Sequence, residues 1–468
     1  MQRCPLCPGI NNVVPSDGPE DADLVFVGEA PGKDENKKLK PFIGKTGDEV
    51  NRGYLPLCNL RRENVLFTNA IRCLPPGIGR LNSKRDADLQ MLQSCAECHL
   101  YPELEAARPE LIIPMGAFAC RAIDPDIDLE IHHGFPLDTS RGTVFPMYHP
   151  AGGIHEPKKM LQIRTDWTRL NKYLKGKLKL PKDHFAGIEQ YELITDPELV
   201  TATLESYRHM SMSCDTEITR QKIPYCLTFS TEPGTGFMIL ADDKACLAAF
   251  QEELNQWRGV ILFHNWLFDR DVVIRMGLKF PEKRIRCTML MAFHLGNIPQ
   301  GLKALAYREL GMTMMDFDDL VTPCAVPRVL EYYRDCFVEE WDRPEPQLER
   351  DKDGKWKLYK PQSFTTKLKR FFKDYEKNPL KDVFEMWTKN WEPLQAEVEE
   401  RVGPWPGKCI TYAAEDRWED TLRYACRDAD ATIRLYPVLK RMIRNMRKTV
   451  AENWGDYDSR NNLSLQSR

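Results

Sequence analysis

The sequence predicts an α/β protein made of two domains, each built around its own β-sheet. Three observations support this fold class. The chain has 468 residues, which is too long for one ordinary hydrophobic core. Short apolar stretches typical of strands recur in both halves, separated by charged stretches with helical periodicity. Between the two series, residues 173–187 are basic and broken by Gly and Pro, as expected of a linker.

The first half is expected to form a parallel sheet, because its strands alternate with helices. The expected strands cover 22–28, 65–71, 110–116 and 143–148. The expected helices cover 86–108 and 159–175. We place this domain at 1–175 and the linker at 176–190.

A second α/β series follows and is placed at 191–447. The expected strands are 209–214, two paired strands within 223–240 (PYCLTFS and GTGFMIL, joined by TEPG), and 259–264. A charged, mostly helical insertion is expected at about 320–410, with one turn signal at 351–354. A closing helix is expected at 420–447, followed by a tail at 448–468.

The composition is that of a globular protein, with 42% hydrophobic and 29% charged residues. No apolar run has the length of a membrane span, and the N-terminus lacks the features of a signal peptide. We therefore expect a cytoplasmic protein without a membrane partner. The fifteen cysteines are then expected to stay reduced, so clustered ones are candidates for metal binding. A net charge of −3 means that nucleic acid would be bound by local basic patches and cations.

Four acidic residues in the second half form a candidate metal site. Asp215 and Glu217 are two apart on an expected strand, so both side chains project from one face. Asp269 follows a strand in HNWLFD, and Asp428 lies in YACRDADAT at the expected start of a helix. Taken singly, each is more often a helix cap or a solvated surface group. Together they match the several carboxylates that phosphodiester hydrolysis with two divalent ions needs, and Mg²⁺ or Mn²⁺ suits such ligands.

The series CDTEIT, HNWLFD and YACRD resembles the three motifs of the 3′→5′ exonuclease domain in family A DNA polymerases, a ribonuclease H-like group. The resemblance covers roughly residues 190–440 and implies a mixed sheet. The residues that it implies as ligands of two Mg²⁺ or Mn²⁺ ions are Asp215, Glu217, Asp269 and Asp428. Tyr424 is implied to orient the attacking water, and His264 and Asn265 precede Asp269 as in the family. Asn265 is implied to position the DNA strand, whose single-stranded 3′ end would be the substrate.

A second tyrosine–aspartate pair competes for the last motif. Tyr412 and Asp416 have the same spacing of four as Tyr424 and Asp428, and residues four apart share a helix face. We favour Asp428, because DADATIRLY continues as in the family with small residues and then an apolar helical face. Asp416 is followed by RWED, which is typical of a solvated turn.

The first half carries a different set of motifs. GEAPG at 28–32 supplies a glycine-rich turn after a strand, which alone is a weak phosphate-loop signal. The motifs that follow it are KPFIGKTG at 40–47, TNAIRCLPP at 68–76, LIIPMG at 111–116 and YHPAGG at 148–153. The whole series resembles the iron–sulfur-containing family 4 uracil-DNA glycosylases over roughly residues 1–175.

This second resemblance implies a pocket for a flipped-out uracil. Phe42 would stack on the base, Asn69 would read its hydrogen-bonding edge, and His149 would stabilise the departing uracil anion. Glu29 and Glu35 occupy the family's two acidic positions around the water. Cleavage of a base–sugar bond needs these residue types, since a cation-like sugar and an anionic base develop together. Taken singly, each residue is more often structural.

Four cysteines are candidate ligands of an inorganic cofactor. Cys4 and Cys7 form a tight chelating pair, and Cys73 lies far from them in sequence. The fourth is Cys95 or, as the reserve, Cys98, with the helical register favouring Cys95. Four thiolates can hold a [4Fe–4S] cluster or, alternatively, tetrahedral zinc, and the resemblance favours the cluster.

The two halves together resemble the N-terminal part of phage family A DNA polymerases. The chain stops at NNLSLQSR, so the polymerase is either absent from a fragment or encoded as a separate chain. For a phage protein, the expected location is the host cytoplasm. We therefore expect a DNA-processing enzyme that trims 3′ ends and recognises uracil, with excision of the uracil as a further expectation. The alternative is an exonuclease subunit whose first half binds uracil or single-stranded DNA without catalysis.

Overall fold

The computed structural model describes residues 12–74, 86–155, 159–296, 298–341, 347–350, 356–359 and 406–461. The chain divides into two compact units. Unit 1 comprises Met1–His184, Met289–Thr313 and Val438–Arg468. Unit 2 comprises Phe185–Thr288 and Met314–Pro437. The first cut falls inside the expected linker, whereas the assignment of two later segments to unit 1 was not expected from the sequence.

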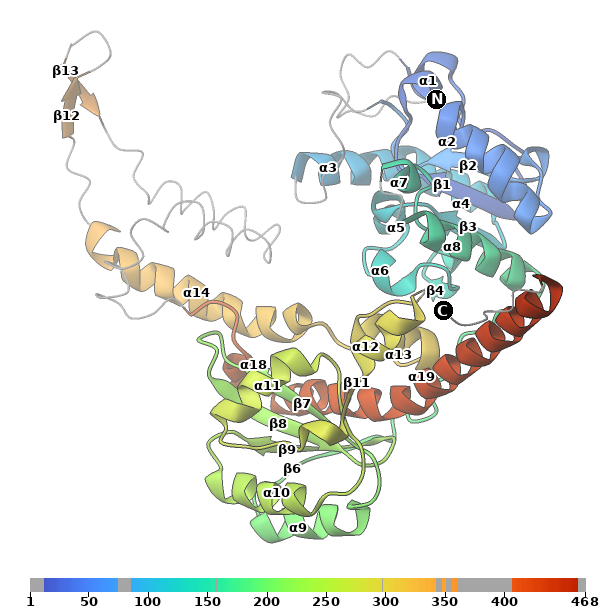
Figure 1. The fold of residues 1–468 in the computed structure, drawn as a ribbon. Helices are drawn as coiled ribbons and strands as arrows, with labels where there is room; N and C mark the ends of the chain where they lie inside the picture. The colour runs from blue at the N-terminus through green and yellow to red at the C-terminus, as the bar shows by residue number, and fades with distance from the viewer. Residues whose placement is uncertain are drawn as a thin grey trace. The chain divides into compact units, whose positions relative to one another are not determined.

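Unit 1 contains a five-stranded sheet, which Figure 1 shows from the side. Its strands are β1 (Leu24–Gly28), β2 (Leu66–Asn69), β3 (Leu111–Pro114), β4 (Leu137–Thr139) and β5 (Gly142–Val144). In the order β2-β1-β3-β5-β4, neighbouring strands are parallel except β4, which pairs antiparallel with β5. The expected parallel sheet is thus confirmed, and the hairpin that adds β4 at its edge was missed.

Helices cover both faces of this sheet, which gives three layers. The helices before the linker are α1 (Lys33–Lys38), α2 (Gly44–Glu49), α3 (Asp86–Cys95), α4 (Tyr101–Ala107), α5 (Ala117–Ile123), α6 (Leu129–His132), α7 (Ala151–His155) and α8 (Lys159–Leu174). Shorter π or 3₁₀ turns are η1 (Val50–Tyr54), η2 (Leu55–Cys58), η3 (Arg62–Asn64) and η4 (Ala96–Leu100). One core cluster joins the strands to α3, α4 and α5, and another joins them to η1, η2 and α8. In the latter, Trp167 stacks on Phe26 and Tyr54 with ring centroids 5.5 and 5.4 Å away.

Unit 2 contains a six-stranded mixed sheet in the order β11-β10-β7-β8-β9-β6. Its strands are β6 (Gln190–Leu193), β7 (Met212–Ile218), β8 (Pro224–Ser230), β9 (Thr235–Leu240), β10 (Ile261–Phe263) and β11 (Ile285–Cys287). Strands β7, β8 and β9 form an antiparallel meander, while β10 and β11 continue parallel to β7. The α/β fold class with a mixed second sheet is confirmed; the edge strand β6, parallel to β9, was not expected.

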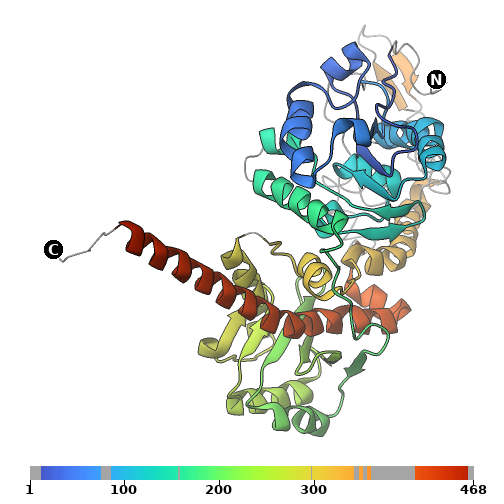
Figure 2. The same cartoon turned by 90° about the vertical axis from the view of Figure 1, so that its right-hand side faces the viewer.

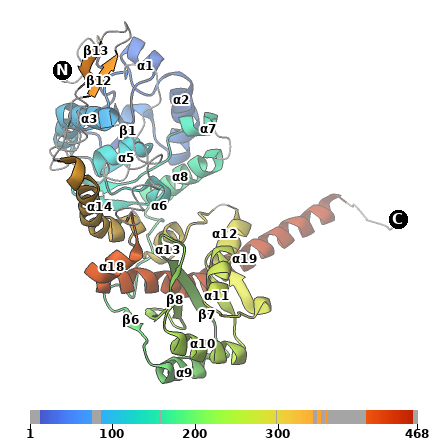
Figure 3. The ribbon, with the colours of Figure 1, turned by 90° about the vertical axis from the view of Figure 1, so that its left-hand side faces the viewer.

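Different helices cover the two faces of the second sheet. The helices of unit 2 are α9 (Pro197–Leu204), α10 (Lys244–Gln256), α11 (Trp266–Arg275), α18 (Ile410–Asp416) and the first part of α19 (Trp418–Asn461), with the short turns η5 (Glu205–Tyr207) and η6 (Glu282–Arg284). Helices α12 (Thr288–Leu295) and α13 (Leu302–Leu310) lie, apart from Thr288, in the segment that belongs to unit 1. Helices α9 and α10 lie side by side along one face, as Figures 1 and 3 show. The first part of α19 packs on the other face, against Cys226 and Met238. Helix α19 contains Pro437 and continues to Asn461; Figure 2 shows it as the long red helix.

Two expectations about the C-terminal region need correction. Asp428 lies well inside α19 and not at its start, because the helix begins at Trp418. The closing helix also extends beyond the expected 420–447 into the region expected to be a tail.

The described part of the insertion is a helix followed by a hairpin. Helix α14 (Phe317–Trp341) contains two prolines, and β12 (Gln347–Arg350) pairs antiparallel with β13 (Trp356–Tyr359). The hairpin brackets the turn signal at 351–354, which itself lies outside the described residues, as does 360–405. Among the described helices, none combines the length and apolarity needed to cross a membrane.

Candidate functional site

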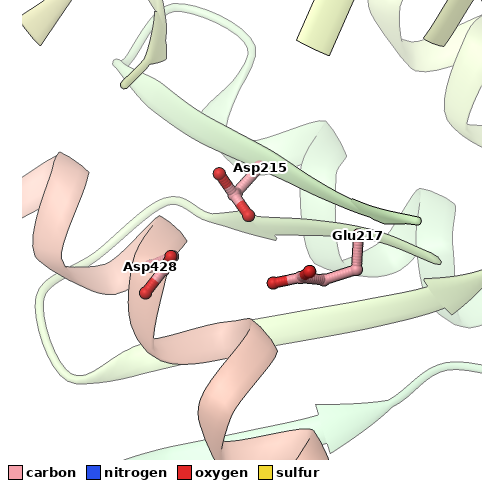
Figure 4. Close-up of side chains that lie close together, drawn as sticks. All are labelled: Asp215, Glu217 and Asp428. Atoms are coloured by element: carbon pink, nitrogen blue, oxygen red, sulfur yellow. The ribbon is translucent and has the colours of Figure 1, made fainter. Parts of the chain in front are cut away.

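Three carboxylates from two elements of unit 2 meet on the sheet face that α19 covers. Asp215 and Glu217 lie on β7, and Asp428 faces them from α19 (Figure 4). One carboxylate oxygen from each lies within 4.8 Å of the other two. The helix is held here by Thr228, which pairs with Asp215 across β7 and β8 and donates a hydrogen bond to the carbonyl oxygen of Ala425 (3.2 Å). The chain thus brings together negative charges that repel one another unless a cation neutralises them.

Asp269 adds a fourth carboxyl group, whose charge interacts with those of Asp215 and Asp428. It lies in the first turn of α11 and is 1% exposed, and Thr216 donates a hydrogen bond to its Oδ1 (2.8 Å). Burial raises the pKa of Asp269 to about 7. Burial also raises the pKa of Asp215 well above its usual range, and repulsion from Asp269 is the next largest cause. Oxygen donors crowded in this way, three half-buried and one fully buried, fit hard divalent cations such as Mg²⁺ or Mn²⁺.

Tyr424 lies one helical turn before Asp428, on the same side of α19. Burial, followed by the charges of Glu217 and Asp428, raises the pKa of Tyr424, so its phenol stays protonated and can donate. Of the two residues before Asp269, His264 places Nδ1 2.9 Å from the Thr288 hydroxyl, and Asn265 begins α11 with a left-handed backbone (φ 77°).

The competing pair is used elsewhere. Asp416 forms a two-pronged ion pair with Arg328, with N–O distances of 2.6 and 3.0 Å, and Glu415 joins it at 2.7 Å. The guanidinium of Arg328 also lies 4.7 Å from the ring centre of Tyr412. The structure therefore places Asp428, and not Asp416, beside Asp215 and Glu217. That these carboxylates bind metal stays a prediction.

The implied uracil-pocket residues of unit 1 converge on Gly28 at the end of β1. A Cβ atom added at Gly28 would lie 2.2 Å from Oδ1 of Asn69 and 2.8 Å from Cζ of Phe42. Asn69 is the partner of Gly28 in the register of β1 and β2. The rings of Phe42 and His149 face each other with centroids 6.2 Å apart and planes inclined by 29°. Only glycine at position 28 leaves space for the amide and the aromatic ring to meet.

The backbone of Phe42 is fixed from both sides in a left-handed conformation (φ 52°). Its N–H donates to the carboxylate of Glu35, which also accepts from the N–H of Gly32 (2.5 Å). Its carbonyl oxygen accepts from Arg62 (3.0 Å) and Asn51 (3.2 Å). Arg62 and Asn51 were not identified from the sequence, since donation to a backbone carbonyl leaves no residue-type signature. Glu35 therefore at least positions the ring that is expected to stack on the base.

His149 is set up as a neutral hydrogen-bond donor. Its Nδ1 accepts a hydrogen bond from the N–H of Ala151 (3.2 Å), which assigns the ring proton to Nε2. Burial lowers the pKa of His149 to about 4, so the ring is uncharged at neutral pH. A cavity of about 590 Å³ opens beside it, with walls that include Tyr148, Gly116 and Leu129.

Glu29, the other acidic position, lies against the start of α5. Its Oε1 accepts a hydrogen bond from the N–H of Phe118 (3.2 Å). Gly116 leaves room for this carboxylate, because an added Cβ would lie 2.4 Å from Oε1. Burial raises the pKa of Glu29, while the N–H groups of Phe118 and Ala117 oppose the shift.

The described cysteine candidates differ in burial. Cys73 and Cys95 belong to the same core cluster, at 4% and 2% exposure, whereas Cys98 is exposed. The N–H of Arg72 donates to the sulfur of Cys95 (3.1 Å). Backbone donors of this kind accompany the thiolates of iron–sulfur centres, so the two buried thiols fit such a group. Cys4 and Cys7 lie outside the described residues.

Three solved structures with some likeness to the chain are the following. The catalytic core of RRP6 from Trypanosoma brucei is 15% identical, with a TM-score of 0.26, over 31% of this chain and 40% of that one. RNase D from the same organism is 13% identical, with a TM-score of 0.24, over 51% of this chain and 73% of that one. NrnC from Brucella melitensis with bound Mg²⁺ is 16% identical, with a TM-score of 0.22, over 28% and 65%. Scores this low carry no argument about the chemistry of unit 2.

The N-terminal region has much closer relatives. Residues 15–175 match the uracil DNA glycosylase superfamily. The type-4 uracil-DNA glycosylase of Archaeoglobus fulgidus is 34% identical over 178 residues, which are 36% of this chain and 85% of that one. The enzyme of the same type from Thermotoga maritima is 31% identical over 157 residues, 32% and 78% of the two chains. Through this region, the chain belongs to the type-4 uracil-DNA glycosylase family.

Proposed function

We propose that the protein is a DNA-processing enzyme with two active sites. Unit 1 excises uracil from DNA, and unit 2 removes nucleotides from single-stranded 3′ ends with the help of two divalent cations. The observation that carries the proposal is the pairing, in one chain, of the Gly28–Phe42–Asn69–His149 pocket with the carboxylates around Asp215.

In unit 1, the residues act on a uracil that has left the base stack. Phe42 stacks on the ring, and the side-chain amide of Asn69 hydrogen-bonds its polar edge. As the bond between base and sugar breaks, negative charge develops on the uracil. The Nε2–H of His149 donates a hydrogen bond to that charge. The neutral imidazole already carries this hydrogen, so no change of protonation is needed before it donates. Glu29 and Glu35 are the candidate carboxylates beside the water that attacks the sugar.

In unit 2, Asp215, Glu217, Asp269 and Asp428 are the proposed ligands of the two cations. Bound Mg²⁺ or Mn²⁺ supplies positive charge that activates water and stabilises the leaving oxygen. Tyr424 donates its phenolic hydrogen to the attacking water and so orients it. Asn265, in its left-handed conformation at the start of α11, is the candidate contact to the DNA strand.

An iron–sulfur cluster is proposed for Cys4, Cys7, Cys73 and Cys95. Four thiolates can hold a [4Fe–4S] cluster, whose contribution here is structural. It would tie the N-terminal segment to the core cluster that contains Cys73 and Cys95. Zinc is the alternative with the same ligands.

Uracil release from a 5′-labelled oligonucleotide with one uracil tests the unit 1 assignment. EDTA in the reaction keeps unit 2 inactive. The wild type should release uracil, and Asn69→Ala and His149→Ala should each slow release by about 100- to 1,000-fold, the usual cost of one lost electrostatic donor. A wild type that binds the uracil-containing strand but releases no base would contradict excision and favour the non-catalytic binding role.

Degradation of a 5′-labelled single strand in Mg²⁺ tests the unit 2 assignment. Asp428→Ala should lower the rate by more than about 100-fold, since even loss of a residue that only supports a metal ligand costs 10- to 100-fold. Asp416→Ala is the matched control, because that aspartate has the same motif spacing but pairs with Arg328. An equal loss of nuclease rate in the two variants, or an undiminished rate in Asp428→Ala, would contradict the assignment of Asp428 as a metal ligand.

The trimming activity is proposed to serve a DNA polymerase of the phage family A type, carried on a longer chain or encoded separately. The resemblance of the three motifs supports this role. A polymerase reading frame beside, or continuous with, that of this protein is the observation that checks it.

A further inference from the structure

A segment from between two of the carboxylate motifs is built into unit 1. Residues Met289–Thr313 follow Asp269 and precede Asp428 in sequence, yet they belong to the compact unit of the uracil pocket. In this segment α13 packs on α6, where the edge of the Tyr307 ring meets His132 with centroids 4.8 Å apart. Gly311 ends α13 (φ 69°) so close to the linker that an added Cβ would lie 1.9 Å from the carbonyl oxygen of Pro181.

Arg308 of α13 forms a polar link between this segment and the rest of unit 1. Its side chain is buried, with the residue 3% exposed. Nε donates to the carbonyl oxygen of Ile131 (3.1 Å), and Nη2 donates to those of Glu130 (3.3 Å) and His133 (3.0 Å). The last carbonyls of a helix have no donors within the helix, and a cation is favoured there. Arg308 therefore fixes the C-terminal end of α6.

A series of hydrogen bonds leads from His133 to Tyr148, the residue that precedes His149. His133 Nδ1 lies 2.7 Å from Oδ1 of Asp166, a carboxylate with no exposed surface. The other oxygen of Asp166 accepts from the N–H of Tyr148 (3.2 Å). The rings of His133 and Tyr148 are also in contact, with centroids 4.4 Å apart. The order of contacts is thus Arg308, His133, Asp166, Tyr148 and then, along the chain, His149.

The same contacts set two walls of the cavity beside His149. Leu129 and Glu130 of α6 line it on one side, and Tyr148 and His149 line it on another. Arg308 holds the first wall directly and the second through Asp166. Arg308 and Arg169 both place positive charge near the buried carboxylate of Asp166, which favours the burial of that negative group.

We propose that Arg308 is a positioning residue of the uracil site, which holds α6 and the Tyr148–His149 segment in the arrangement that excision needs. The inference rests on the proposed excision of uracil by unit 1. It means that residues outside the region matched to the glycosylase superfamily, in the part of the sequence between the exonuclease-like motifs, complete the first active site. Arg308 does not touch the base; it acts through His133, Asp166 and Tyr148.

Single-turnover uracil release by the full-length protein, in EDTA and with protein in excess, tests this role. Arg308→Met keeps the apolar stem and removes every donor. We expect it to lower the maximal rate on the order of 100-fold, the cost of a misplacement of about 1 Å at a reacting group. If Arg308 had a merely structural role, the substitution would reduce the fraction of active molecules. More protein would then be needed to reach the half-maximal rate, but the maximal rate would be unchanged.

Four further variants sharpen the result. Arg308→Lys keeps the charge with fewer donors in reach and should give an intermediate maximal rate. Asp166→Asn should slow release, and the double variant with Arg308→Met should be no slower than the slower single variant, because the two residues act in one series of contacts. Arg141→Met is the control, since Arg141 also donates to a backbone carbonyl (Ile123, 3.2 Å) and lies over an aromatic ring (Tyr101) but has no part in that series.

A wild-type maximal rate in Arg308→Met, or an equal loss in Arg141→Met, would overturn the inference while the proposed excision stands. Multiplying losses in the double variant would also overturn it. Failure of the proposed function has a different signature, because the wild type itself would then release no uracil, and the positioning role would fall with it.

Discussion

At the scale of single residues, the proposed uracil pocket depends on one imidazole whose protonation is set by its surroundings. The N–H of Ala151 occupies Nδ1 of His149, and burial disfavours the charged ring. The imidazole therefore stays uncharged at neutral pH, and its Nε2–H remains available to donate into the pocket. An exposed histidine would instead change its charge close to pH 6.5.

The pH dependence of uracil release should reflect this. Because the pKa of His149 is lowered to about 4, the neutral donor persists as the pH falls from 7 to 5 and is lost only as the pH passes through about 4. We expect single-turnover release to vary less than about three-fold between pH 7 and 5.5 if no other group titrates in the step. An acid limb with its midpoint near 6.5 would show that the ring is not buried in the working enzyme.

The sequence identified the residues that would touch substrate or metal better than those that hold them. Phe42, Asn69 and His149 stand in motifs whose order is informative, and the structure brings them together. Arg62 reaches the carbonyl oxygen of Phe42 from 20 positions away, and Arg308 reaches that of His133 from 175 away. Both donate to backbone, which any residue type can offer as acceptor, so no pattern of side chains marks the contact.

At the scale of elements, the junction of α3 and η4 separates two cysteines that the sequence left as alternatives. On an α-helix, residues three apart are neighbours on one face, so Cys95 and Cys98 would both remain candidates. Helix α3 ends at Cys95 and continues as the π turn η4, which is wider than an α turn. The change of pitch leaves Cys95 buried beside Cys73 in the core cluster and Cys98 exposed.

Iron analysis of two serine variants checks which cysteine is the ligand. We expect Cys95→Ser to lose most of its iron and acid-labile sulfide, because a buried thiolate ligand is removed. Cys98→Ser should keep both at the wild-type ratio to protein. Loss of iron in Cys98→Ser alone would reverse the assignment, and zinc in place of iron in the wild type would replace the cluster.

Apolar strands were easier to predict from the sequence than strands with half-buried or exposed side chains. Strands β1, β2, β3 and the meander β7–β9 are largely apolar and bounded by turn residues, which is why their pattern is clear although β2 stands at an edge of its sheet. The edge strands β4 and β6 have mostly half-buried or exposed side chains and lack that pattern. Their place in the sheets depends on tertiary contacts that short sequence windows do not carry.

At the scale of the whole molecule, each proposed set of reacting groups lies within one compact unit. Phe42, Asn69 and His149 belong to unit 1, and the carboxylates around Asp215 belong to unit 2. Neither site takes a proposed catalytic residue from the other unit. The two chemistries are therefore expected to be separable by point substitution.

Variants that inactivate one site should leave the other working. We expect Asp215→Ala to release uracil within about two-fold of the wild-type rate and His149→Ala to degrade single strands within the same range, because substitutions without shared partners act independently. Both activities are measured on one preparation of each variant. Loss of both activities in either variant, with an unchanged melting temperature, would show that the sites are coupled.

The extent of each unit could not be read from the sequence. Composition marks the linker, and the cut at His184 falls within it. The inclusion of 289–313 and of the chain from Val438 in unit 1 follows from packing, such as that of α13 on α6. Sequence patterns report local periodicity, and they do not say which of two nearby cores receives an amphipathic helix.

The placement of Arg308 also bears on how the protein is made and how it can evolve. A ribosome completes residues 1–184 long before Arg308 leaves the exit tunnel, so the end of α6 lacks its guanidinium during much of synthesis. Such distant contacts form late and slow the completion of folding. Under the positioning role proposed for Arg308, the glycosylase-like unit could not be transferred by its first 184 residues alone, because a recombination event of that extent would leave behind the guanidinium that bonds the end of α6.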